Sequence, residues 1–233
     1  MLEGGGERVR PRPPGAVART MTAAGRLVLP VLGLIGAFAL AYAARGEPAS
    51  DLRFLDKIDP ALDVAGWLNW GHLLLPGVFF VLNLTSRRYG PGIALASAVI
   101  AWVAMGGGIA WALSDGILLS FGEIAPLPVA ASFVGAMFTG QLVSVYLFDW
   151  LRGIPWWQAP LVAALFGGLA FVGAFHAGAS SFWAGGAWAG GGEAMLPRLA
   201  LLGAVQLVWA LLQLIPTQFL RGAIRPASGY GGA

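Results

Sequence analysis

Few side chains within the apolar stretches of this sequence could do chemistry, and those that could are neutral and polar. They are His72, Asn83, Gln141, Ser144, His176, Gln206 and Gln213. A polar group in hydrocarbon costs free energy, so such a residue usually binds a ligand, lines a water-filled space or joins helices. Gln206, Trp209 and Gln213 recur at i, i+3 and i+7, which places them on one helical face. That face either lines a cavity for a polar aromatic ligand or joins helices, and the sequence favours neither.

The same residues exclude several classes of site. The chain has no cysteine, so thiolate metal sites and disulfides are impossible. His72 and His176 have no zinc-type spacing, and we expect both to be satisfied residues near the membrane surface. No serine has a paired base, no lysine follows a phosphate-binding glycine loop, and the apolar stretches hold no carboxylate pair. The sequence therefore predicts no enzyme, no metal site and no cofactor.

The composition indicates what surrounds these residues. Hydrophobic residues make up 58% of the chain and charged residues 11%, whereas soluble domains carry about a quarter charged residues. A helix needs about 20 apolar residues to cross a bilayer, and several stretches approach that length. They are Arg26–Ala44, Trp70–Leu84, Gly92–Leu113, Pro126–Phe148, Ala159–His176 and Leu196–Leu220. The predicted fold is all-α, a polytopic membrane protein with six transmembrane helices.

The charged residues predict the orientation of these helices. With the N-terminus in the cytoplasm, only Glu3, Glu7 and Asp149 of the 11 acids lie inside. Of the 14 basic residues, those inside are Arg8, Arg10, Arg12, Arg19, Arg26, Arg87, Arg88, Arg152, Arg221 and Arg225. The positive-inside rule therefore predicts that both termini are cytoplasmic. Because the basic residues flank apolar stretches, we expect them to face a lipid bilayer and not nucleic acid.

This orientation divides the chain into three parts. We expect a disordered basic cytoplasmic tail over residues 1–22, a membrane domain over 23–221 and a second cytoplasmic tail over 222–233. Between the first two apolar stretches, Leu52, Leu55, Ile58 and Leu62 recur at helical spacing with aspartates between them. That pattern predicts an amphipathic segment at the outer surface, either a connector or a lid over an outward-facing cavity.

Small residues indicate which helices pack together. They recur four apart at Ser132, Ala136, Gly140 and Ser144, and again at Ala159, Ala163 and Gly167. Such faces let two backbones approach closely in lipid, where no hydrophobic drive brings helices together. Because only a short turn separates the two stretches, we expect an antiparallel packed pair.

The turn between these two stretches carries a longer pattern. Its members are Gly140, Gln141, Phe148, Asp149, Leu151, Arg152, Trp156, Trp157, Ala159 and Pro160. A second set is Leu75, Pro76, Phe79, Asn83, Leu84, Thr85, Arg87, Tyr89 and Gly90, with Pro216 as a further match. In these residues the chain resembles the queuosine precursor transporter family, also called the VUT family of vitamin-uptake-like proteins.

The resemblance implies a six-helix importer with a central cavity in a bacterial inner membrane. Its substrate would be a queuosine precursor of the 7-deazaguanine type or a related small polar heterocycle. The implied substrate-binding residues are Asn83, Arg87, Gln141, Ser144, Gln206 and Gln213. Asn83 and Gln141 are expected to hydrogen-bond the ring edge. Arg87 alternatively sets topology and contacts lipid headgroups.

Some positions depart from the family pattern. Asn83, Ser144, Phe171 and Gln206 stand where the family has charged residues. A carboxylate accepts two N–H bonds from such a ring, whereas asparagine and serine do so more weakly and phenylalanine cannot. The loss of interior charge favours a second hypothesis, a non-transporting structural or accessory subunit bound to membrane protein partners. The retained Gln141 and the intact turn favour transport.

Overall fold

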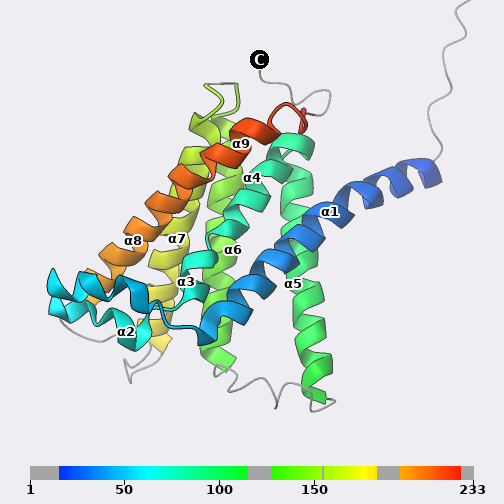
Figure 1. The fold of residues 1–233 in the computed structure, drawn as a ribbon. Coiled ribbons are helices and arrows are strands. Elements are labelled where there is room, and N and C mark those ends of the chain that lie inside the picture. The colour runs from blue at the N-terminus through cyan, green and yellow to red at the C-terminus, as the bar shows by residue number, and fades with distance from the viewer. Residues whose placement is uncertain (1–15, 115–126, 154, 183–194, 227–233) are drawn as a thin grey trace, which may run out of the picture.

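The computed structural model describes residues 16–114, 127–153, 155–182 and 195–226, which form a bundle of helices (Figure 1). The long helices are α1 (Ala16–Ala43), α4 (Gly77–Tyr89), α5 (Pro91–Ser114), α6 (Leu127–Trp150), α7 (Gln158–Phe182) and α8 (Met195–Leu212). The short ones are η1 (Ala44–Gly46), η2 (Ser50–Lys57), η3 (Pro60–Leu62), α2 (Val64–Trp67), α3 (Trp70–Leu74) and α9 (Leu214–Leu220). Within the described ranges no strand occurs, only one isolated bridge between Pro48 and Asn69. The all-α prediction is confirmed.

Five helical stretches are long and apolar enough to cross a membrane. They are Ala24–Gly46, Pro91–Trp111, Val129–Trp150, Gln158–Gly178 and Met195–Leu220. Each overlaps one of the spans predicted from the sequence, so the chain has the character of a multi-pass membrane protein. Because α1 begins at Ala16, the last residues of the predicted N-terminal tail are helical. Residues 1–15 and 227–233 of the two predicted tails lie outside the described residues.

The predicted span Trp70–Leu84 forms two shorter helices, α3 and α4, instead of one long helix. Pro76 separates them because proline has no amide hydrogen and its ring clashes with the carbonyl four residues earlier. At this break, the indole N–H of Trp209 in α8 donates to the carbonyl of Leu73. This segment is not among the long apolar helices, so a sixth crossing remains a prediction.

A second proline interrupts the last crossing. Pro216 leaves the carbonyl of Leu212 without its helical donor, and Gln213 separates α8 from α9. The backbone of Gln213 still bonds in both directions, its N–H to the carbonyl of Trp209 at 2.9 Å and its carbonyl to the N–H of Thr217 at 3.1 Å. The interruption is therefore local, and it carries the buried side chain of Gln213.

The α6–α7 pair is the most extensively packed in the structure, and the predicted small residues form its contact. A Cβ atom added to Gly140 would lie 2.5 Å from the carbonyl oxygen of Gly167, so the two backbones touch at this point. Ala136, Ser144 and Ala163 are buried beside it. The predicted antiparallel pair is confirmed, and Phe79 of α4 packs against both glycines.

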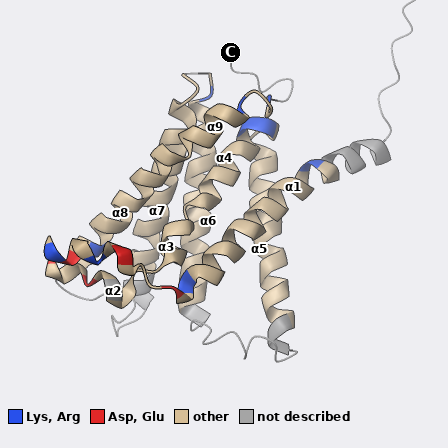
Figure 2. Ribbon diagram, viewed as in Figure 1, with Lys and Arg blue, Asp and Glu red and all other residues tan. Residues whose placement is uncertain are grey.

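Charged residues occupy the two ends of the bundle, and its middle is almost free of them (Figure 2). One end, near α9 and the end of α4, carries Arg87, Arg88, Arg152, Arg221 and Arg225. The opposite end carries Arg45, Glu47, Arg198 and the charged residues of η2, with Asp59 and Asp63 on either side of η3. Residues predicted to share one side of the membrane thus lie at one end of the bundle. The assignment of the first end to the cytoplasm stays a prediction.

The predicted amphipathic segment forms the 3-10 helices η2 and η3. Leu62 is buried against the core and Leu55 is half-buried, as the pattern indicated, whereas Ile58 is 76% exposed. Ile58, the C-cap residue of η2, departs from the predicted pattern. An ion pair between Asp63 and Arg198 of α8, at 3.8 Å, links this segment to the bundle.

Candidate functional site

Three of the predicted site residues meet in the interior of the bundle. The hydroxyl of Ser144 in α6 donates to Oδ1 of Asn83 in α4 at 3.3 Å. The amide of Asn83 donates to the carbonyl of Pro160 in α7 at 3.2 Å and to Oε1 of Gln213 at 3.4 Å. Gln213 donates from Nε2 to the same Pro160 carbonyl at 2.8 Å. We call Asn83, Ser144, Gln213 and the Pro160 carbonyl the polar centre.

The fold places these groups together through its close packing and its helix break. Gly140 and Gly167 bring α6 against α7, and Ser144 follows one turn after Gly140. Gln213 enters from the interruption between α8 and α9. Asn83 and Gln213 are each 2% exposed and Ser144 is fully buried. All the groups are neutral, so the polar centre offers donors and acceptors without a charge.

Gln141 lies outside the polar centre, next to α5. Its Oε1 accepts a hydrogen bond from the indole N–H of Trp102 at 3.0 Å. Its Nε2 is buried and has no hydrogen-bond partner within the described residues. A buried donor without a partner costs about 1–3 kcal/mol, so it calls for a water or a ligand atom.

Gln206 is also separate from the polar centre. Its side chain packs on α7, where a Cβ added to Gly168 would lie 2.1 Å from Oε1. This Oε1 is buried and, within the described part of the chain, accepts no hydrogen bond. The face predicted to hold Gln206, Trp209 and Gln213 is therefore not a single site. Gln213 belongs to the polar centre, Trp209 donates to the Leu73 carbonyl, and Gln206 packs on α7.

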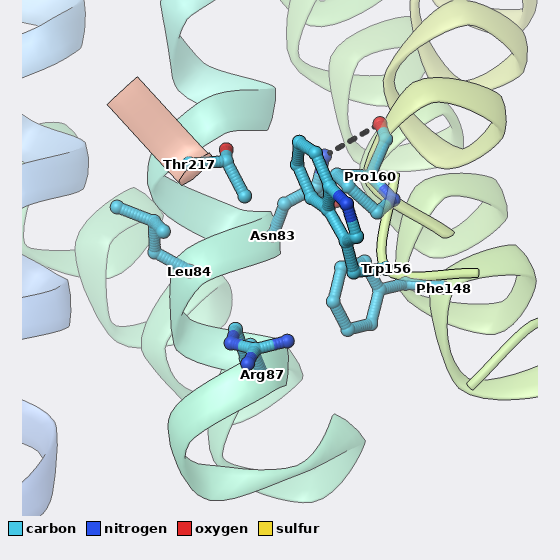
Figure 3. Close-up of a pocket in the computed structure, with 7 residues that line it drawn as sticks. All are labelled: Asn83, Leu84, Arg87, Phe148, Trp156, Pro160 and Thr217. Atoms are coloured by element: carbon cyan, nitrogen blue, oxygen red, sulfur yellow. Dashed lines mark hydrogen bonds between the residues drawn. The ribbon is translucent and has the colours of Figure 1, made fainter. Parts of the chain in front are cut away.

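A small hollow adjoins the polar centre (Figure 3). Its lining residues are Asn83, Leu84, Arg87, Phe148, Trp156, Pro160 and Thr217. Its volume is about 10 Å³, close to the minimum that holds one water molecule. The hollow therefore has no room for a bicyclic ring in this conformation.

Arg87, the remaining predicted site residue, lines this hollow on the side of the charged end (Figure 3). Its Nε donates to the carbonyl of Ile224 at 3.2 Å. Burial lowers the pKa of Arg87, and the nearby guanidinium groups of Arg221 and Arg152 lower this pKa further. The group is therefore partly desolvated and lies among charges of its own sign.

The residue types in these sites are suited to binding. Among the described residues, no cluster of three or more His, Cys, Asp or Glu side chains could hold a metal ion. The polar centre holds amides and a hydroxyl, none of which ionises near neutral pH. The arrangement can hydrogen-bond a neutral polar group.

Several residues of the site were not predicted from the sequence. Trp102 is the donor to Gln141, the Pro160 carbonyl is the common acceptor of the polar centre, and Trp156 lines the hollow. A backbone acceptor has no sequence signal, and nothing in the spacing links Trp102 to a residue 39 positions later.

In comparisons with family models, with curated proteins and with solved structures, nothing matches this chain. The resemblance to the queuosine precursor transporter family therefore rests on the residues quoted above.

Proposed function

We propose that this protein is a multi-pass carrier of a bacterial inner membrane that imports a small, flat, polar heterocycle, with a queuosine precursor of the 7-deazaguanine type as the leading candidate. The observation that carries the proposal is the polar centre, in which Asn83 and Gln213 both donate to one backbone carbonyl and Ser144 donates to Asn83. Polar groups buried at this depth are costly and usually functional.

The chemistry of the polar centre suits a ring with donors and acceptors along its edge. Two amides and a hydroxyl supply both kinds of group. Outside the polar centre, Gln141 Nε2 and Gln206 Oε1 are buried without a partner among the described residues. Because the hollow has a volume of about 10 Å³, binding requires a more open conformation. The helix breaks at Pro76 and Gln213 adjoin this region and are natural places for such opening.

The proposal includes a sixth crossing formed by α3 and α4 together. Residues 70–84 rise about 22 Å if helical throughout, a short crossing that local thinning of the bilayer accommodates. With this crossing, an even number of spans places both termini on one side, as the charges predict.

The test is import in a host that cannot make queuosine. The gene is deleted, the host is supplied with the precursor, and queuosine in tRNA is measured. We expect modification to fall on deletion and to return with the wild-type gene. Gln213→Leu should fail to restore it, whereas Gln218→Leu, the same change at an exposed position of α9, should restore it. Unchanged modification on deletion would contradict import of this precursor.

A second candidate is a non-transporting subunit of a membrane complex. It is favoured by one observation, that the members of the polar centre hydrogen-bond one another and leave a hollow of only about 10 Å³. In that case the polar centre joins helices, and the protein should copurify with stoichiometric partners. Loss of those partners on Gln213→Leu, with no effect on tRNA, would support this candidate.

A further inference from the structure

The charged end of the bundle near α9 contains more positive than negative groups, and three of its arginines lie around the hollow. Arg87 lines the hollow directly. Two more guanidinium groups stand over its aromatic walls, with Arg221 at 5.2 Å from the ring centre of Trp156 and Arg152 at 5.8 Å from that of Phe148. We call these three arginines the guanidinium rim.

The guanidinium rim has one acidic neighbour among the described residues. Asp149 pairs with Arg152 at 2.9 Å, and the other described carboxylates lie at the opposite end of the bundle (Figure 2). Arg88 adds a further positive charge beside the rim and donates to the carbonyl of Arg225. Like charges this close repel one another, and an anion bound between them would offset the repulsion.

Arg152 is paired with Asp149, whereas Arg87 contacts a backbone carbonyl and Arg221 an aromatic ring, neither of which neutralises their charge. Arg87 donates its Nε to the Ile224 carbonyl, and among the described residues the two terminal nitrogens of its fork have no acceptor. Arg152 donates to the carbonyl of Ser86 at 3.1 Å, which joins α6 to α4. The positive-inside rule explains why arginines occur at this end, but it does not require them to converge on one hollow with aromatic walls.

We propose that the guanidinium rim binds a phosphate group at the mouth of the hollow. Forked arginine donors match phosphate oxygens, and basic pockets between membrane helices bind phospholipid headgroups. The shared chemistry is a phosphate that carries net negative charge, from either an anionic phospholipid or a soluble phosphate. The proposal does not rest on import of a heterocycle.

The test uses the purified full chain in a neutral detergent. Phosphatidylglycerol or inorganic phosphate is added at constant ionic strength, and thermal unfolding is followed by circular dichroism. Phosphatidylcholine and chloride serve as the matched additions. We expect phosphatidylglycerol, phosphate or both to raise the Tm of the wild-type protein by several degrees, because a ligand that binds only the folded state stabilises it.

The variants assign the effect to the guanidinium rim. Arg87→Gln and Arg221→Gln should each need about tenfold more ligand for the same Tm shift, as expected for loss of a charge-assisted hydrogen bond. Arg53→Gln removes the same charge from an exposed position of η2, at the opposite end, and should behave as wild type. Arg87→Lys keeps the charge without the fork and should fall between the two. If Arg87→Gln does not fold, the Tm shifts of Arg221→Gln, a change at an exposed position, decide the outcome.

The two ligand series identify the source of the phosphate. A Tm shift with phosphatidylglycerol alone assigns the site to a lipid headgroup, and a shift with inorganic phosphate assigns it to a soluble anion. The proposal is overturned if neither ligand exceeds its matched addition, or if Arg87→Gln and Arg221→Gln respond as Arg53→Gln does.

Discussion

The α6–α7 pair and the α1–α5 pair both consist of helices long enough to cross a membrane, yet they are packed differently. In the most apolar stretch of α6 and of α7, 39% of the residues are buried, against 22% in α1 and in α5. Backbones touch in the first pair at Gly140 and Gly167. In the second pair large side chains make the contact, such as Phe38 of α1 against Trp102 of α5, with ring centres 4.7 Å apart.

The difference shows that small residues and large aromatic residues have separate roles in packing the bundle. Small residues allow the backbone contact that brings the polar centre together. Large rings fill the wider space toward α1, and much of α5 beyond Trp102 is exposed, as expected for a surface that faces lipid. The hydrogen bond from Trp102 to Gln141 joins the two halves. The following variants test whether the α6–α7 pair is packed more closely than the α1–α5 pair.

The largest effect is expected from Gly140→Ala. The added methyl group would meet the Gly167 carbonyl at 2.5 Å and the Phe171 Cβ at 2.9 Å, so α6 and α7 must move apart. We expect the free energy of unfolding in mixed micelles, measured by loss of helical circular dichroism, to fall by about 2–3 kcal/mol. Gly135→Ala on the same helix meets nothing within 4 Å and should slightly stabilise the protein. Equal effects at the two glycines would remove the distinction between the pairs.

Gln213→Leu should be next in size. It removes the amide that bonds both Asn83 and the Pro160 carbonyl. Hydrogen bonds between membrane helices contribute modestly, so we expect a loss of about 1–2 kcal/mol in the same unfolding measurement. The exposed Gln218→Leu should change stability by less than about 0.5 kcal/mol. A stable Gln213→Leu protein that no longer imports would instead assign the amide to ligand binding.

Trp102→Phe tests the link between the two halves. The smaller phenyl ring keeps an aromatic group beside Phe38, but the N–H that bonds Gln141 is lost. We expect a loss of about 1 kcal/mol, the usual size for one hydrogen bond. Trp150→Phe, at a position that is 70% exposed, is the matched control and should be close to neutral. A loss as large as that of Gly140→Ala would mean that α5 is held as firmly as α7.

The smallest effect, and one of opposite sign, is expected from Gly107→Ala in the exposed half of α5. Nothing lies within 4 Å of the added methyl group. Alanine favours the helix over glycine, so stability should rise by about 0.5–1 kcal/mol. A decrease would show that another surface packs closely on this side of α5 and would weaken the contrast with α7.

The sequence predicted the helices well because apolar length and small-residue spacing are local signals. It located the five long stretches and the α6–α7 contact. It did not show that Pro76 divides a predicted span, although proline in an apolar run permits that outcome. Nor did the helical pattern reveal that Ile58 lies past the end of η2.

The candidate site was only partly predictable. Polarity within apolar stretches selected Asn83, Ser144 and Gln213, and the structure brings these three together. The same reasoning grouped Gln141 and Gln206 with them, because spacing along one helix does not show which neighbour a side chain meets. The shared Pro160 carbonyl depends on three-dimensional packing and has no counterpart in residue type.

The bond from Trp209 to the Leu73 carbonyl has a consequence for the order in which the protein is built. The carbonyls at the end of a helix lack intrahelical donors, and in lipid they must find a partner. The partner of Leu73 lies 136 residues further along the chain, in α8. Until α8 has been synthesised, this carbonyl must therefore stay hydrated or be held by the insertion machinery. The break at Pro76 thus acquires its partner only after α8 has joined the bundle.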